Sequence, residues 1–188
     1  MEAFLVSTAV VAIGEIGDKT QLLALLLAAR FQRPIPIILG ILVATLANHS
    51  LAGLLGEWIR HAVSADTLRW GLGASFLAVG LWALKPDEID DDPQPVGHYG
   101  VFVITLLTFF LAEMGDKTQL ATVMLAAKFP SLLSVIAGTT LGMMIADVPA
   151  VFLGKMSADK IPFKAIRIVA AALFGILGVA TLAGADFI

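Results

Sequence analysis

The residues with the clearest chemical potential in this chain are two copies of one motif, Glu-x-Gly-Asp-Lys-Thr-Gln. The first copy runs from Glu15 to Gln21 and the second from Glu113 to Gln119. In each copy the two acids lie three residues apart, so on a helix both carboxylates project from one face. Hard divalent cations such as Mn²⁺, Ca²⁺ and Mg²⁺ prefer oxygen ligands of this kind. Two such motifs facing each other could therefore bind a divalent cation.

Each motif contributes predicted ligands and predicted supporting residues. The predicted metal ligands are Glu15, Asp18, Glu113 and Asp116. The predicted supporting residues are Gln21, Gln119, Lys19, Lys117, Thr20, Thr118 and Asp147. We expect the glutamines to add amide oxygens, the lysines to pair with the acids of an empty site, and the threonines to cap backbone carbonyls. The predicted site is a cage of four carboxylates and two amide oxygens, flanked by two ammonium groups.

The charge of this cage indicates what could occupy it. Four carboxylates and two lysines leave a net charge of −2, which one divalent cation or two protons would neutralise. Crowded carboxylates in a medium of low dielectric constant should take up protons when no metal is bound. Metal ions and protons would then compete for the same oxygens. This competition is the physical basis of cation/proton antiport.

Two positions leave alternatives open. Gly17 has no side chain, so either another backbone approaches closely there or the helix unwinds and offers carbonyl oxygens. Asp147 falls where the first half of the chain has His49. It could be an extra ligand, a proton-carrying residue, or a polar group bonded to a neighbouring helix. A purely structural role for the motif itself would be an i,i+4 ion pair between Glu15 and Lys19, but this pair leaves Asp18 unexplained.

The elements that position these residues must lie in a membrane. Of the 188 residues, 59% are hydrophobic and only 14% are charged, and the mean hydropathy is +0.92. A soluble domain is about 25% charged, so lipid is the expected solvent. The net charge of −3 argues against nucleic acid as a partner. Cysteine is absent, which excludes a thiolate metal site.

The apolar segments predict an all-α integral membrane protein with six transmembrane helices. A spanning helix needs about 20 mostly apolar residues. The predicted spans are Phe4–Ala29, Ile35–Ile59, Leu68–Leu84, Val101–Ala127, Leu132–Leu153 and Phe163–Leu182. Both motifs then lie about midway along a span. The six motif charges would cost on the order of 15–20 kcal/mol if they were unpaired there, so they must pair, take up protons, line water or bind an ion.

A shift of 98 residues superimposes the second half of the sequence on the first without a gap. Both motifs match, and so do later pairs such as Gly40 with Gly138 and Arg69 with Arg167. The predicted units are residues 1–84 and 99–188, joined by an acidic linker at 85–98. Each unit has three spans, an odd number, so the two repeats should be inverted in the membrane. Secondary transporters with this symmetry bind their substrates where the halves meet, near the midplane.

The distribution of basic residues predicts the orientation. The connections after the first, third and fifth spans hold Arg30, Arg33, Lys85, Lys155, Lys160, Lys164 and Arg167, whereas the opposite side holds Arg60, Arg69 and Lys128. The positive-inside rule then places the first set and the linker in the cytoplasm, and both termini outside. The N-terminus has no basic signal region, so we expect the first span to be retained. We expect a bacterial cytoplasmic membrane.

The segments Gly14–Leu23 and Ala112–Thr122 resemble the signature of the Gdt-type cation/proton exchanger family. This family includes bacterial manganese exporters and Golgi Mn²⁺/Ca²⁺ transporters, and its pattern is E-x-G-D-[KR]-[ST], present twice. The resemblance implies that the four motif acids bind the cation and that the lysines and threonines are the other motif positions. It also implies export of Mn²⁺, or exchange of Ca²⁺ or Mn²⁺ for protons. No prosthetic group is expected.

Three other functions remain open at this stage. An intramembrane aspartyl protease also places two aspartates on facing helices, but it carries a Gly-x-Gly-Asp motif where this chain has Glu15 and Glu113 at the first position. A passive divalent-cation channel could use the same carboxylate cage. An exporter of organic cations or amino acids would be preferred if Mn²⁺ did not bind.

Overall fold

The structure of the chain is a computed structural model that describes residues 1–85, 100–153 and 163–184. The described residues form eight helices and no strand, which confirms the all-α prediction. The helices are α1 (Glu2–Glu15), α2 (Lys19–Phe31), α3 (Pro34–Ala62), α4 (Ala65–Ala83), α5 (Val101–Glu113), α6 (Lys117–Lys128), α7 (Leu132–Leu153) and α8 (Phe163–Leu182). Except for Lys85, the predicted acidic linker lies outside the described residues, as do Lys155 and Lys160.

Two of the six predicted spans are not continuous helices. The span predicted at Phe4–Ala29 is divided into α1 and α2, and the span predicted at Val101–Ala127 is divided into α5 and α6. The prediction of one continuous helix through each motif was wrong, and unwinding at the motif glycine, the alternative left open above, is what the structure has. The other four predicted segments each coincide with one helix to within three residues at either end.

The breaks have a local cause in the motif sequence. Ile16 has φ −62° and ψ 120°, and Gly17 has φ 82°. These are the values of a type II turn, in which the third residue needs a positive φ that glycine adopts without steric cost. The turn closes with a hydrogen bond from the Asp18 N–H to the Glu15 carbonyl oxygen at 3.0 Å. The sequence Glu-x-Gly-Asp therefore encodes a turn with one carboxylate at each end.

The second motif repeats this geometry closely. Met114 has φ −64° and ψ 121°, Gly115 has φ 77°, and the Asp116 N–H donates to the Glu113 carbonyl oxygen at 3.1 Å. Asp18 and Asp116 are the N-caps of α2 and α6, with almost equal backbone angles. The two breaks are therefore the same structural element built twice.

Glycines allow two long helices to pack directly on the broken ones. In α7, a Cβ added at Gly138 would lie 2.5 Å from the Phe4 carbonyl oxygen, and one added at Gly142 would lie 2.7 Å from the Thr8 carbonyl oxygen, both in α1. In α3, a Cβ at Gly40 would lie 2.7 Å from Thr105 Cβ in α5. Small residues at the spacing of Gly138 and Gly142 let helix backbones approach closely. This close packing places α7 against α1 and α3 against α5.

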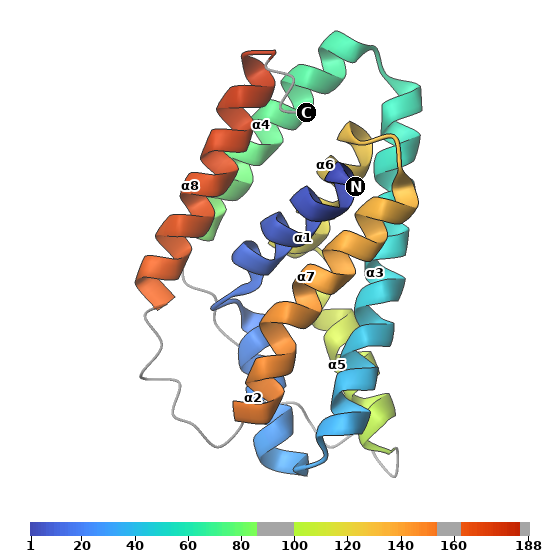
Figure 1. Cartoon of the computed structure of the whole chain (residues 1–188), viewed down its shortest axis with the longest axis vertical. Coiled ribbons are helices and arrows are strands. Elements are labelled where there is room, and N and C mark those ends of the chain that lie inside the picture. The colour runs from blue at the N-terminus through green and yellow to red at the C-terminus, as the bar shows by residue number, and fades with distance from the viewer. Residues whose placement is uncertain (86–99, 154–162, 185–188) are drawn as a thin grey trace.

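The arrangement of the helices buries the acids at both breaks (Figure 1), although Met114 and Gly115 of the second turn are exposed. The α1–α2 pair runs down the picture, and the α5–α6 pair runs up it. The helices α4 and α8 pack against each other along one side of the molecule. Among the described residues, two helices are both long enough and apolar enough to cross a membrane, and they are α3 and α7. The breaks explain why neither half of a divided segment is long enough to do so.

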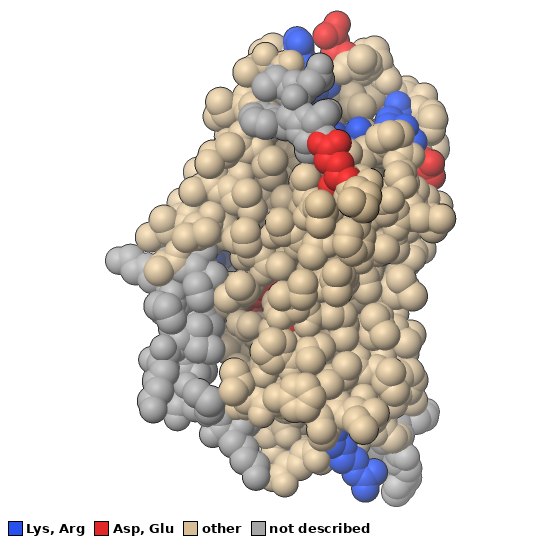
Figure 2. All heavy atoms as spheres, in the orientation of Figure 1, with Lys and Arg blue, Asp and Glu red and all other residues tan. Residues whose placement is uncertain are grey.

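The surface supports an apolar environment (Figure 2). On the face shown, Lys, Arg, Asp and Glu gather at the two ends of the molecule, and the broad band between them lacks charged residues apart from a few atoms seen at depth. Large exposed apolar side chains include Leu54, Leu111, Phe152 and Ile176. Exposed apolar area on this scale marks a surface that contacts lipid or another protein.

Candidate metal centre

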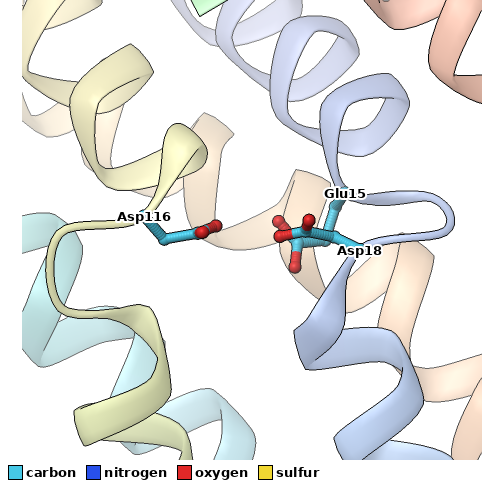
Figure 3. A group of neighbouring side chains, drawn as sticks. All are labelled: Glu15, Asp18 and Asp116. Carbon is cyan, nitrogen blue, oxygen red and sulfur yellow. The ribbon is translucent and has the colours of Figure 1, made fainter. Parts of the chain in front are cut away.

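The two turns bring acids from distant parts of the sequence together. Glu15, Asp18 and Asp116 each offer a carboxylate oxygen, and these oxygens all lie within 4.8 Å of one another. Figure 3 shows Glu15 and Asp18 side by side at the first turn, with Asp116 pointing toward them from the second. None of the three is more than 1% exposed. The structure thus gathers three of the four predicted ligands into one buried cluster.

The fourth predicted ligand, Glu113, is not a member of that cluster. Its Oε1 accepts a hydrogen bond from Thr118 Oγ1 at 3.0 Å and lies 3.5 Å from His49 Nε2 in α3. It is 1% exposed and still interacts electrostatically with Glu15. Sequence reasoning did not identify His49 as its partner. The register of the repeat, which aligns His49 with Asp147, was the available signal.

Each lysine pairs with the aspartate of the other motif. Lys19 Nζ lies 3.1 Å from Asp116 Oδ1, and Lys117 Nζ lies 2.6 Å from Asp18 Oδ1. The i,i+4 pair between Glu15 and Lys19 is not among the ion pairs of the described residues. The turn breaks the helix between these two positions, so the regular i,i+4 geometry on which that pair depends is lost. The lysines instead join the two halves of the molecule at the site.

The two glutamines do not supply free amide oxygens, which corrects the predicted cage. Gln21 Oε1 accepts the Gly17 N–H at 2.8 Å, and Gln119 Oε1 accepts the Gly115 N–H at 2.7 Å. These N–H groups belong to the turns and have lost their helical partners. The Gly17 N–H is partly buried, and a buried backbone donor without a partner costs about 1–3 kcal/mol. The glutamines therefore stabilise the turns that position the carboxylates.

The same side chains also tie each turn to the long helix of the opposite half. Gln21 Nε2 donates to the Ala146 carbonyl oxygen in α7 at 3.1 Å, and Gln119 Nε2 donates to Asn48 Oδ1 in α3 at 3.3 Å. Ala146 and Asn48 are equivalent positions under the 98-residue shift. A movement of α3 or α7 would consequently move the turn that packs against it.

The threonines of the two motifs have different roles. Thr118 Oγ1 donates to Glu113 and lies 3.5 Å from Asp116 Oδ2, so it serves the acids and does not cap a carbonyl as predicted. Thr20 is fully buried, and its hydroxyl has no hydrogen-bond partner among the described residues. The prediction that the two motif threonines cap backbone carbonyls is therefore wrong for the described structure.

Asp147 lies in α7, the helix that packs on α1. It is fully buried, and neither of its carboxylate oxygens has a hydrogen-bond partner within the described parts of the chain. Both carboxylate oxygens of Glu15 are in the same condition. The two groups interact electrostatically, and Asp147 also interacts with Glu113. Asp147 therefore belongs to the same charged network as the motif acids.

The arrangement of the broken helices and buried acids is characteristic of one class of protein. Two broken helices meet at buried carboxylates that are partly compensated by lysines from the opposite motif. Discontinuous helices whose ends face a buried ion site are typical of membrane transporters. Intramembrane acids of this kind mark ion pathways.

The comparison with known families also indicates a membrane transporter, and it identifies the family. The chain belongs to the GDT1 family, whose model, described as "Divalent cation/proton antiporter GDT1", matches residues 3–91 and 101–187. The protein is therefore a membrane transporter and not an enzyme, and the protease alternative is rejected. The resemblance inferred from the two motifs is confirmed.

Curated relatives from several organisms cover nearly the whole chain. A Vibrio cholerae protein named "Putative manganese exporter" is 50% identical over 96% of this chain and 90% of its own length. The GDT1-like protein sll0615 of Synechocystis is 28% identical over 95% of this chain and 96% of its own length. The GDT1-like protein 5 of Arabidopsis thaliana is 26% identical over 97% of this chain and 96% of its own length. No solved structure matches the chain significantly.

Proposed function

We propose that this protein exports a divalent cation, Mn²⁺ in preference to Ca²⁺, in exchange for protons by alternating access. The observation that carries the proposal is the buried cluster of Glu15, Asp18 and Asp116, with oxygens within 4.8 Å of one another. Carboxylate oxygens at this spacing suit a hard divalent cation. The name of the Vibrio cholerae relative favours manganese as the cargo.

The proposed topology is six membrane spans in two inverted repeats, residues 1–84 and 99–188, with the linker at 85–98. In this topology α1 with α2 counts as one broken span, and α5 with α6 as its equivalent. Three observations support it: the gapless 98-residue repeat, the matching turn geometry, and the opposite directions of α1–α2 and α5–α6 (Figure 1). The family model also matches two stretches of similar extent, one in each half.

The lysines explain how an empty site can exist in a membrane. Without a cation, Lys19 and Lys117 lie at the aspartates of the opposite motifs, where they act as tethered positive charges. An arriving cation would compete with the ammonium groups for the same oxygens. Protons arriving from the other side would neutralise the carboxylates and release the metal. One set of oxygens thus serves the cation and the protons in turn, which couples the two movements.

An asymmetry between the lysines supports alternating access. The Lys19 side chain is 29% exposed, whereas the Lys117 side chain is 5% exposed. In this conformation the site is therefore more accessible beside Lys19 than beside Lys117. Exchanging the conformations of the two repeats would expose Lys117 and bury Lys19. Such an exchange would open the site to the opposite side of the membrane.

The proposed location is the cytoplasmic membrane of a bacterium, with both termini outside. The connection between α2 and α3, which contains Arg30 and Arg33, would then face the cytoplasm. The acidic linker would face the same compartment.

The function can be tested with the purified protein in proteoliposomes. Starting from equal Mn²⁺ on both sides and an imposed pH gradient, we expect net Mn²⁺ movement that builds up a Mn²⁺ gradient as protons move down theirs. A passive channel cannot move Mn²⁺ uphill, so movement only down the Mn²⁺ gradient would favour the channel and contradict exchange. Transport of Ca²⁺ with no transport of Mn²⁺ would overturn the proposed cargo.

A further inference from the structure

The two motif glutamates occupy equivalent positions but have different surroundings. Glu113 accepts a hydrogen bond from Thr118 at 3.0 Å and lies 3.5 Å from the His49 imidazole. The equivalent hydroxyl, on Thr20, does not bond Glu15, and neither oxygen of Glu15 has a hydrogen-bond partner among the described residues. Glu15 is nevertheless fully buried. Its two oxygens therefore lack the donors that its counterpart has.

The residue at the equivalent position of the two long helices also differs. His49 in α3 is the neighbour of Glu113, and the 98-residue shift places Asp147 in α7 at the same position. Asp147 interacts electrostatically with both motif glutamates, and its helix packs through Gly138 and Gly142 on α1, the helix that ends at Glu15. Where the second motif has a potential cation, the first has another carboxylate. This replacement removes a favourable partner from Glu15 and adds a repulsive one.

Two buried carboxylates of the site lack a compensating partner. Lys117 pairs with Asp18 and Lys19 pairs with Asp116. Glu113 accepts the Thr118 hydroxyl, so the carboxylates with neither an ion pair nor a hydrogen-bond partner among the described residues are Glu15 and Asp147, which would together carry −2 when ionised. A buried ionised carboxylate without a partner costs several kcal/mol. A single divalent cation between these two groups would neutralise both.

We propose that Asp147 is a ligand of the transported cation in addition to the cluster of Glu15, Asp18 and Asp116, and that the cation is bound closer to Glu15 than to Glu113. The inference rests on the proposed function and refines its site. Glu15 and Asp147 supply charge that no lysine compensates, and Asp18 and Asp116 add oxygens when Lys117 and Lys19 withdraw. Glu113, which already has partners, contributes less. The site is asymmetric although the backbone around it is repeated.

Metal binding to the purified protein in detergent tests this directly. A ligand that binds the native state raises the melting temperature by an amount that grows with the logarithm of its concentration relative to Kd, so a titration with MnCl₂ gives an apparent Kd without any transport step. We expect Asp147→Asn to raise this Kd at least tenfold, since even residues outside the coordination sphere change metal affinity by about 10–100-fold. His49→Gln should have a clearly smaller effect.

Thr140→Val provides a matched control, because Thr140 is a buried polar residue two turns earlier in the same helix and has no place in the proposed site. It should bind Mn²⁺ as the wild type does. Equal Kd values for Asp147→Asn and the wild type would overturn the inference, as would equal losses in Asp147→Asn and His49→Gln. If the wild type itself showed no stabilisation by Mn²⁺, Ca²⁺ or Mg²⁺, the proposed function would fail as well, and the two failures are thus distinguishable.

A second measurement keeps the inference testable if Asp147→Asn does not fold. Anomalous scattering from Mn²⁺ in crystals of the wild-type protein would locate the ion directly. We expect the peak within bonding distance of oxygens of Glu15 and Asp147, and closer to Glu15 than to Glu113. A peak equidistant from the two glutamates, with no contact to Asp147, would refute the asymmetric site.

Discussion

The two motifs of this protein have nearly the same backbone and different chemical surroundings. Their turns agree to within about 5° at the glycine, and both glutamine oxygens bond the glycine N–H at almost the same distance. Yet Glu113 has a hydroxyl and an imidazole beside it, whereas Glu15 has Asp147. Repetition has therefore preserved the scaffold that positions the acids. The partners on neighbouring helices have diverged, and they decide what each acid can bind.

The lysines show the same contrast between equal scaffold and unequal surroundings. Both cross to the aspartate of the other motif, but Lys117 is buried at 2.6 Å from its partner and Lys19 is partly exposed at 3.1 Å. An inverted pair of repeats need not adopt equal conformations at one time. An alternating-access mechanism requires them to differ, because equal halves would leave the site equally open or closed to both sides.

The largest expected effect separates the two glutamates. Glu15→Gln should reduce pH-driven Mn²⁺ transport in proteoliposomes to the background level, because it removes a buried carboxylate that has no other partner. Glu113→Gln should retain measurable transport, since that side chain is bonded to Thr118. Efflux rates at matched protein content would compare them. Equal rates for the two variants would show that the two glutamates are functionally equivalent.

An intermediate effect is expected for the lysine pairs. Lys117→Gln leaves Asp18 buried without its ion-pair partner, and breaking a buried pair costs about 3–5 kcal/mol. Lys19→Gln should cost less, because the Lys19 side chain is 29% exposed and solvent already screens the pair, although Asp116 itself is buried. Melting temperatures in detergent without divalent cations would measure both. Adding Asp18→Asn to Lys117→Gln should recover part of the loss, and no recovery would mean that the ion pair is not its cause.

The smallest expected effect concerns the feature that the two motifs share. Gly115→Ala forces a side chain into a backbone conformation with φ 77°, which costs about 1–2 kcal/mol. No heavy atom of a neighbouring group lies within 4 Å of the added Cβ, so backbone strain is the whole cost. Thermal unfolding in detergent would detect a small decrease in melting temperature. An unchanged melting temperature would show that the turn tolerates a Cβ and is less strictly specified than its angles indicate.

The sequence predicted the fold class and the identity of the charged residues because these depend on composition and local pattern. Apolar runs predicted the helical segments, and four of them match single helices. The sequence contained a signal for the breaks, since Glu-x-Gly-Asp is compatible with a type II turn and unwinding at Gly17 was one of the two alternatives left open. Periodicity favoured a continuous helix because the apolar pattern continues on both sides of the motif.

Several features of the site could not be predicted from the sequence. The choice of partner for Lys19 depends on which helix end lies opposite it, and an i,i+4 pattern contains no information about that. The glutamine oxygens were available to a metal in principle, but the turn exposes a glycine N–H that binds them first. His49 became a neighbour of Glu113 only because Gly40 allows α3 to approach α5 closely.

The sequence by itself determined that two acidic turns would lie in apolar helices, since the residues responsible are adjacent in the chain and act through backbone angles and solvation. The tertiary structure alone decided how those acids are compensated. Helix packing sets the distances between groups about a hundred residues apart, and electrostatic energy in an apolar interior depends steeply on such distances. The same short motif could therefore be repeated unchanged while its two copies acquired different partners.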